Sequence, residues 1–290
     1  MLAPRGLEND VPAIEAGAFL TRDGLRLPLR HWDAAKPVAV IVALHGMSDY
    51  SNAFDMPATW WATKGITTYA YDQRGFGRAP HQENRLDRRA ARRLLATALH
   101  SARAKHPGLP VYALGESMGG AVVLSALASK QPPHVEGVIL IAPAVWSRAD
   151  MPLSYRAALW TVAHTMPWLN LSGEGLKIWP SDNIEMLKKL SRDPLFQHKT
   201  RADAVYGLTD LMDEARRAPD HLDHLPPILF LYGAKDQVIP REPTEAVVAA
   251  LGSRAKVQRF DKGYHMLLRD LDAKTVWSAV VDWIRQRTVS

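Results

Sequence analysis

Short apolar runs rich in β-branched residues recur along the chain, and stretches with helical periodicity separate them. The apolar runs lie at Val38–Leu44, Thr67–Tyr71, Val111–Gly115, Val135–Ala142 and Ile228–Gly233. The helical stretches lie near Ala53–Lys64, Leu86–Lys105 and Met118–Lys130. Near-continuous apolar strands that alternate with helices predict a mostly parallel sheet with helices on both faces.

The two ends of the chain extend this pattern. Ala18–Thr21 and Leu25–Trp32 flank an Asp23-Gly24 turn signal, which predicts a hairpin, so we expect the sheet to begin with antiparallel strands. At the other end, a strand at Lys256–Phe260 and a helix over Ala273–Arg287 complete the predicted fold.

The alternation stops between about Val145 and Leu225, where the sequence predicts helices with no strand between them. From Ala157 to Gly173 it has no charged residue. The segment contains four tryptophans and four methionines, namely Trp146, Trp160, Trp168, Trp179, Met151, Met166, Met186 and Met212. An insertion between two core strands predicts a helical cap over the sheet edge where α/β proteins bind ligands. We therefore expect a core domain of residues 1–144 and 226–290 and a cap of residues 145–225.

Composition excludes several classes of site. The chain of 290 residues has no cysteine, which excludes disulfides, thiolate nucleophiles and cysteine-bound zinc. The first residues lack the features of a signal peptide, and no apolar run reaches the length of a membrane-spanning helix. We expect a soluble protein, cytoplasmic by default, unless a signal was trimmed from a bacterial envelope form.

The net charge of +6 owes much to one helical stretch that carries Arg85, Arg88, Arg89, Arg92 and Arg93. Such a run can attract phosphates, but a solvated outer helix face is the favoured interpretation. No alternation of basic and aromatic residues and no zinc-finger spacing supports a nucleic-acid partner, so none is expected. The oligomeric state is not predicted.

The strongest chemical signal is the Gly-x-Ser-x-Gly sequence at Gly115–Gly119, whose serine is Ser117. It follows a predicted strand and precedes a predicted helix, the context in which such a serine is held exposed in a tight turn as a nucleophile. The structural alternative is a glycine-rich helix start that only packs closely. The partners that follow in the sequence favour the nucleophile.

Asp236 and His265 follow in the order serine, acid, histidine that α/β hydrolases use. A serine hydroxyl needs an imidazole to take its proton, and the imidazole needs a carboxylate to fix its tautomer. Asp236 comes three residues after the glycine that ends a buried strand, and His265 lies between the next strand and the last helix. The alternatives are a turn-forming aspartate and a surface histidine.

Two backbone N–H groups are needed to stabilise the oxyanion that forms when a serine attacks a carbonyl. Met118, directly after the nucleophile, is expected to supply one of them. Met47, in the loop His45-Gly46-Met47-Ser48 after the first core strand, is expected to supply the other. The side chain of His45 is expected to brace this loop.

The chain resembles the monoacylglycerol lipase and lysophospholipase branch of the α/β hydrolases, which includes serine aminopeptidase S33-type relatives. The resemblance runs from about Leu27 to Trp283 and rests on six motifs: His45-Gly46, Tyr71–Gly77, Gly115–Gly120, Arg192–Leu195, Gly233–Asp236 and Gly263–His265. It implies a carboxylic-ester hydrolase that acts on single-chain lipids or small esters through an acyl-enzyme. It also implies catalytic roles for Ser117, Asp236 and His265 and oxyanion roles for Met47 and Met118. Many relatives have histidine where this chain has Glu116, and we expect the reaction class to be unaffected.

The resemblance implies no cofactor, and we expect no metal. The nearest approach to a metal site is His221 and His224 beside Asp223. Expected partners are an ester or monoacyl lipid and, transiently through the cap, a membrane or micelle surface. The cap is expected to be mobile, lined by apolar residues such as Trp160 and Trp168, and selective for medium or long acyl chains. The alternative, favoured for any single tryptophan, is that these residues fill the core of the cap itself.

Two kinds of alternative remain open. The first is other chemistry on the same fold: aminopeptidase, haloperoxidase-like or acyl-transfer activity. An aminopeptidase would need acidic cap residues to hold a free amine, and the candidates are Glu174, Asp182, Glu185, Asp193, Asp203, Asp210, Asp213 and Glu214. The second alternative is a catalytically silent binding protein.

Overall fold

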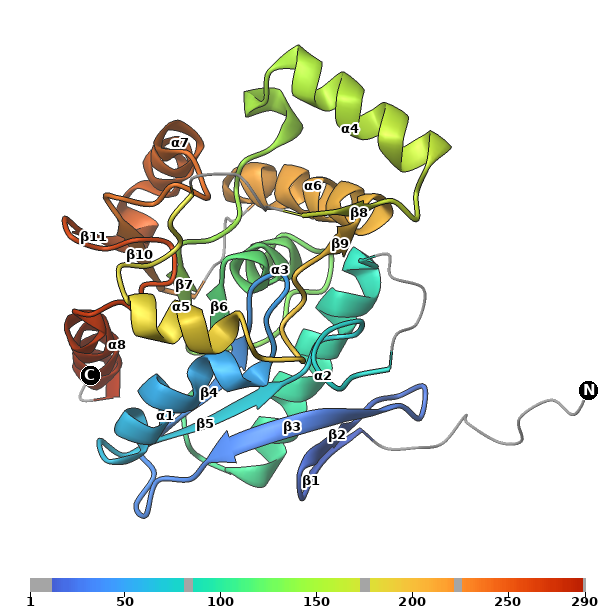
Figure 1. The fold of residues 1–290 in the computed structure, drawn as a ribbon. Helices are drawn as coiled ribbons and strands as arrows, with labels where there is room; N and C mark the ends of the chain where they lie inside the picture. Colours follow the sequence, from blue (N-terminus) through green and yellow to red (C-terminus); the bar gives the residue numbers. More distant parts are fainter. Residues whose placement is uncertain (1–11, 81–85, 173–177, 222–225, 289–290) are drawn as a thin grey trace, which may run out of the picture.

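A nine-stranded sheet forms the centre of the computed structural model, which describes residues 12–80, 86–172, 178–221 and 226–288 (Figure 1). The spatial order of its strands is β1-β2-β3-β5-β4-β6-β7-β10-β11. The strands are β1 (Ala13–Glu15), β2 (Ala18–Leu20), β3 (Arg26–Trp32), β4 (Ala39–Leu44), β5 (Ile66–Tyr71), β6 (Val111–Glu116), β7 (Gly137–Ile141), β10 (Ile228–Gly233) and β11 (Ala255–Phe260). From β5 to β11 all neighbours are parallel, and β1, β2 and β3 join antiparallel.

The structure confirms the predicted parallel sheet and its antiparallel start. β4, β5, β6 and β7 are buried along their whole length, as expected of apolar strands covered on both faces. The hairpin of β2 and β3 forms around the predicted turn. β1 was not predicted, because three residues are too few to show a strand period.

Helices cover both faces of the sheet. One face packs against α1 (Asp55–Ala62) and α8 (Ala273–Thr288), and the other against α2 (Arg88–Lys105), α3 (Met118–Leu127), α6 (Ala202–Arg217) and α7 (Arg241–Leu251). Every residue of α3 is buried, which its apolar sequence explains. Short 3₁₀ turns lie at Ser51–Phe54, Arg148–Asp150, Ala218–His221 and Gly252–Arg254. Within the described ranges, none of the helices is both long and apolar enough to cross a membrane.

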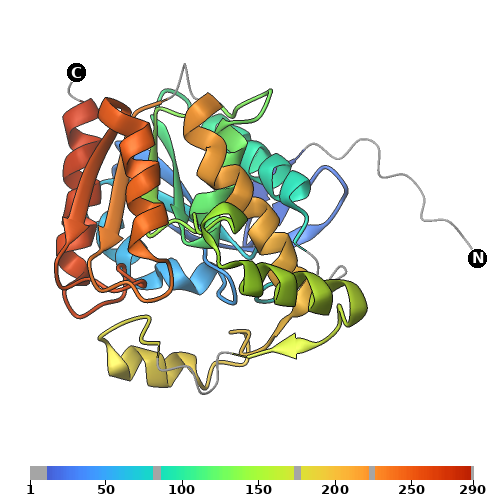
Figure 2. The same ribbon diagram turned by 90° about the horizontal axis from the view of Figure 1, so that it is seen from above.

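The segment expected to be purely helical contains strands, so that expectation is wrong. It forms α4 (Leu153–Thr165), α5 (Ile184–Leu190) and α6, and also a two-stranded antiparallel sheet of β8 (Asn170–Leu171) and β9 (Thr200–Arg201). Strands of two residues leave no periodic signal in a sequence. In Figure 2, α4 crosses the end of α6, and α5 lies on the same side of the molecule.

α6 packs on α3, and its Leu211, Met212 and Ala215 belong to the main hydrophobic core. The division into a core of residues 1–144 and 226–290 and a cap of residues 145–225 stays a prediction. Within the predicted cap, α6 packs against the core helix α3, and α4 packs against α6.

Ion pairs fasten α6 to α2, and they correct the interpretation of the arginine run as a solvated face. Arg88 pairs with Asp210 and with Glu214, and Arg92 pairs with Glu214 at 2.6 Å. These half-buried guanidinium groups face α6, because its acidic residues lie opposite them. Arg89 and Arg93 are exposed as expected.

The tryptophans of the predicted cap also lie differently from expectation. The structure leaves 54% of Trp160 and 63% of Trp168 exposed, and no residue of α4 is buried. α4 is apolar on several sides but rests mainly on α6, so one neighbouring helix cannot cover it. Trp146, by contrast, packs against the core.

Candidate active site

Ser117 occupies a strained turn between the central strand β6 and helix α3. Its φ of 51° and ψ of −117° lie where a residue with a side chain is disfavoured, so the surrounding structure must hold it there. The Ser117 N–H donates to the Ile141 carbonyl, and the Ser117 carbonyl accepts from the Ala144 N–H, each at 2.9 Å. A Cβ at Gly115 would lie 2.4 Å from the Gly119 backbone, which explains why glycine is needed there.

His265 and Asp236 come to the same place from the loops after β11 and β10. The His265 Nε2 lies 2.9 Å from the Ser117 Oγ, and its Nδ1 lies 2.8 Å from the Asp236 Oδ2. The other Asp236 oxygen accepts from the N–H groups of Val238 and Ile239 at 2.8 and 3.0 Å. The structure therefore brings the three predicted residues into one chain of hydrogen bonds.

The surroundings favour the protonated form of His265. Burial by itself lowers the pKa of the imidazole, but the charge and hydrogen bond of Asp236, with further attraction from Glu116, raise it above the ordinary value of 6.5. Arg269 opposes this rise. An imidazole placed in this way can accept a proton from the Ser117 hydroxyl and hold it as a stabilised cation.

The loop after β4 lies against the serine turn. A Cβ on Gly46 would be 3.2 Å from the Ser117 Cβ, so the loop that carries Met47 is in contact with the serine turn. Met118 is the first residue of α3, and no carbonyl within the helix can accept its N–H. Both proposed oxyanion donors thus lie in segments that adjoin Ser117.

His45 braces that loop, as predicted. Its Nδ1 lies 2.8 Å from the Gly46 carbonyl, and its Nε2 accepts from the Gln73 N–H at 3.0 Å. The Gln73 side chain donates back to the His45 carbonyl at 2.8 Å. Burial lowers the pKa of His45, which favours the neutral imidazole that one accepting and one donating ring nitrogen require.

Glu116, the residue before Ser117, is part of a buried charge cluster behind the site. Arg269 donates to the Asp49 Oδ2 at 2.6 Å and lies 3.8 Å from the Glu116 Oε2. Neither Glu116 oxygen has a hydrogen-bond partner among the described residues. Burial raises the pKa of this carboxyl, although Arg269 acts in the opposite direction.

The roles of Asp49 and Arg269 were not predicted from the sequence. The one available signal was a charged pair, Arg269-Asp270, directly after the apolar residues that follow His265. Asp49, Glu116 and Arg269 come from three separate segments, so their contact follows only from the fold.

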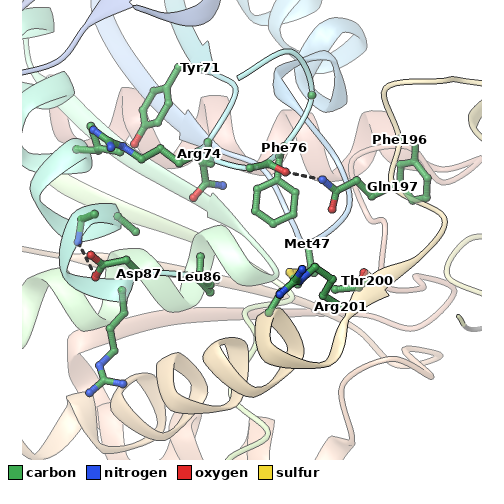
Figure 3. A pocket seen from close by; sticks show the side chains of 18 of the residues that line it. Met47, Tyr71, Arg74, Phe76, Leu86, Asp87, Phe196, Gln197, Thr200 and Arg201 are labelled. Atoms are coloured by element: carbon green, nitrogen blue, oxygen red, sulfur yellow. Dashed lines mark hydrogen bonds between the residues drawn. The ribbon is translucent and has the colours of Figure 1, made fainter. Parts of the chain in front are cut away.

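A pocket of about 1310 Å³ adjoins the Met47 loop (Figure 3). Its wall combines apolar side chains such as Phe76 and Phe196 with polar ones such as Arg201 and Thr200. Gln197 donates to the Gly75 carbonyl and links two parts of this wall. Trp160 and Trp168, which were expected to line an apolar cleft, are not among the described residues of this pocket; both lie exposed instead.

The described part of the chain contains no group of three or more His, Asp or Glu residues that could hold a metal ion. The cluster of His224, Asp223 and His221 considered from the sequence lies mostly outside the described residues, which include only His221.

A parallel sheet between two helical layers, with a serine at the turn from the central strand into a helix, defines an α/β hydrolase. A family model described as serine aminopeptidase, S33, matches residues 35–272, and the chain belongs to that hydrolase family.

Individual proteins show the same relationship. The chain is 25% identical over 300 residues to a human monoglyceride lipase, covering 99% of this chain and 96% of that protein. It is 26% identical over 277 residues to a monoacylglycerol lipase of Mycolicibacterium smegmatis, covering 92% and 95%. The crystal structure of a Paleococcus ferrophilus monoacylglycerol lipase superposes with a TM-score of 0.76 at 22% identity, covering 90% of this chain and 99% of that one. The protein is thus a lipase- and esterase-like α/β hydrolase.

Proposed function

We propose that this protein hydrolyses carboxylic esters through a covalent acyl-enzyme, with Ser117 as nucleophile, His265 as general base and Asp236 as its orienting acid. The observation that carries the proposal is the hydrogen bond of 2.9 Å between the His265 Nε2 and the Ser117 Oγ on a strained strand-to-helix turn. The relatives named as monoglyceride lipases support an ester as the substrate.

The proposed reaction has two halves. The Ser117 Oγ attacks the ester carbonyl carbon while its proton passes to the His265 Nε2, and the oxyanion accepts from the Met47 and Met118 N–H groups. The intermediate then expels the alcohol, which takes the proton from His265 and leaves an acyl group on Ser117. Water, deprotonated by His265, attacks the acyl carbon and releases the carboxylic acid and the free serine.

A monoacyl lipid is the substrate class that the exposed apolar residues favour. Besides Trp160 and Trp168, the exposed large apolar side chains of the predicted cap are Leu153, Tyr155, Met166, Leu169, Ile178, Trp179 and Ile184. A concentration of this kind on one segment is typical of a surface that meets another apolar phase. We propose that the cap contacts a micelle or membrane while it takes up substrate, and that the pocket beside Met47 receives one arm of the ester.

Aminopeptidase activity is the main alternative, and the acidic cap residues argue against it. Asp210, Asp213 and Glu214 pair with arginines, and Asp203 pairs with Arg201. Asp193 accepts from Tyr50, Asp182 from the Leu271 N–H and Glu185 from Lys188, while Glu174 lies outside the described residues. Because the described carboxylates are already engaged, they are poor candidates for holding a substrate amine.

A substrate panel tests the function. We expect p-nitrophenyl esters to be cleaved at least about a hundredfold faster, in kcat/KM, than amino-acid p-nitroanilides. We also expect the rate on a monoacylglycerol to rise steeply where the lipid forms micelles, while the rate on soluble p-nitrophenyl acetate rises smoothly with its concentration. A preference for anilides would favour an aminopeptidase. A chain that neither turns over substrate nor reacts with a fluorophosphonate probe would be a binding protein.

The pH profile tests the base. His265 must be neutral to accept a proton, and its pKa is raised, so kcat/KM should fall on the acid side at a pH above 6.5. In Glu116→Gln this acid-side decrease in kcat/KM should move to lower pH, because a carboxylate that favours the imidazolium is lost while Asp236 and Arg269 remain. Glu185→Gln, at an exposed position on α5, is the control. A flat profile to pH 4 in the wild type would contradict the assignment of His265 as the base. A decrease that stays at the same pH in Glu116→Gln would mean that Glu116 carries no charge that acts on His265.

A further inference from the structure

Residues 179–183, which we call the strap, run through the predicted cap just before α5 and bind the loops of both His265 and Asp236. The Trp179 N–H donates to the Oε1 of Gln237, the residue after Asp236, at 2.9 Å. The Met266 N–H donates to the Pro180 carbonyl at 2.8 Å. The strap therefore contacts the neighbour of the acid and the neighbour of the base.

Ser181 makes the most buried of these links, with only 1% of the residue exposed. Its hydroxyl donates to the Asp270 Oδ1 at 2.6 Å, and the Asp270 Oδ2 accepts from the Tyr264 N–H at 2.7 Å. Burial raises the pKa of Asp270, whereas the hydrogen bonds from Ser181, the Tyr264 N–H and the Asp182 backbone act in the opposite direction and favour its charged form. A continuous chain of hydrogen bonds, buried at its Ser181 end, thus connects Ser181 to the residue that precedes His265.

The strap also binds the far end of the histidine loop, which is the segment of residues 261–272 between β11 and α8. The Asn183 Nδ2 donates to the Arg269 carbonyl, and the Leu271 N–H donates to the Asp182 Oδ1, each at 2.9 Å. Asn183 also begins α5, where its Oδ1 accepts from the Met186 N–H at 3.1 Å. The strap is therefore anchored at the start of a helix.

The histidine loop needs such support because it has little regular structure of its own. β11 ends at Phe260 and α8 begins at Ala273, and the loop's own hydrogen bonds join Arg269 and Asp270 to the Met266 carbonyl. These bonds close a turn after His265, and contacts with other segments set where that turn lies. The Lys235 N–H donates to the Gly263 carbonyl at 2.9 Å and Arg269 pairs with Asp49, while the strap holds the residues on either side of His265. A displacement of about 1 Å in a catalytic group can cost on the order of a hundredfold in rate.

We propose that Ser181 is a positioning residue, which through Asp270 and the Tyr264 N–H sets the place of His265 relative to Ser117. The inference rests on the proposed hydrolase function and adds that a segment of the predicted cap holds the catalytic base. Ser181 itself touches neither the substrate nor the reacting atoms.

The test compares Ser181→Ala with Ser191→Ala in hydrolysis of p-nitrophenyl butyrate, with rates divided by active sites titrated with an organophosphate. Ser191 also lies in the predicted cap, but it is exposed and its hydroxyl donates only to the nearby Lys188 carbonyl. We expect Ser181→Ala to lower kcat per active site about tenfold or more and to change KM by less than about twofold. Ser181→Thr keeps a hydroxyl, so its kcat should be close to that of the wild type. Ser191→Ala should match the wild type.

Asn183→Asp provides a second variant if Ser181→Ala does not fold. It keeps an oxygen for the Met186 N–H but loses the donor to the Arg269 carbonyl, so it too should lower kcat more than it changes KM. The inference is overturned if folded Ser181→Ala keeps kcat per active site within about twofold of an active wild type, even if its Tm is lower. If Ser181→Ala does not fold, the same result for Asn183→Asp overturns it. A wild type that hydrolyses no ester would overturn the proposed function, and the inference with it.

Discussion

Replacing Ser117 by alanine should abolish ester hydrolysis, lowering kcat by about 10⁴- to 10⁶-fold while the fold persists. The change removes the nucleophile and leaves the proposed oxyanion donors and the base in place. Among the described residues, His265 is the hydrogen-bond partner of the Ser117 hydroxyl, so the change leaves no second partner there unsatisfied. The measurements are steady-state hydrolysis of p-nitrophenyl butyrate and labelling by a fluorophosphonate probe, with circular dichroism and Tm to establish folding.

Ser129→Ala is the matched control for this variant. Ser129 lies just beyond the C-terminal end of α3, the helix that Ser117 precedes, and is away from the histidine. The control should keep its activity and its probe labelling. If Ser117→Ala hydrolysed the ester at a wild-type rate, or if the probe labelled it fully, another residue would be the nucleophile.

The serine turn could be predicted from the sequence because its determinants are local. The glycines, the serine, the apolar strand before them and the apolar helix after them occupy one continuous stretch, and the structure places β6 and α3 there. Asp236 and His265 were predicted from their order and from the strands that precede them. The structure brings both to the serine, and their catalytic roles remain predictions that the variants test.

The contacts around these residues could not be predicted because they depend on tertiary structure. Asp49 and Arg269 are 220 residues apart in sequence and meet behind the site. The strap reaches the histidine loop across 89 residues between Ser181 and Asp270. The pattern of apolar and polar residues along a sequence does not indicate such long-range contacts. The packing of α6 on α3 could not be predicted for a related reason, since an apolar stripe alone does not tell a cap helix from a core helix.

The tryptophans show the limit of composition as evidence. Trp160 and Trp168 indicated an apolar cleft, since large aromatic side chains are usually covered. In the structure, α4 has too few neighbours to cover them, so their exposure follows from the arrangement of helices. Which neighbours a helix has is decided by the rest of the chain, and the helix's own residues do not reveal it.

Asp236→Asn should lower kcat by about 10⁴-fold, although it changes a single atom type and keeps the shape of the side chain. The Asp236 Oδ1 accepts from two backbone N–H groups, of Val238 and Ile239. In the variant the amide oxygen should stay with these donors, which turns the amide nitrogen toward the His265 Nδ1. An amide nitrogen donates, so Nδ1 must become the acceptor and the ring proton must move to Nε2.

The His265 Nε2 would then donate to the Ser117 hydroxyl and could not take its proton, so the nucleophile would lose its base. Asp261→Asn, on the exposed start of the histidine loop where Asp261 pairs with Arg259, should keep full activity and serves as the control. Histidine ¹⁵N NMR should show the proton of His265 on Nδ1 in the wild type and on Nε2 in Asp236→Asn. Activity above about a tenth of wild type in the folded variant, or an unchanged ring tautomer, would mean that Asp236 does not orient the base.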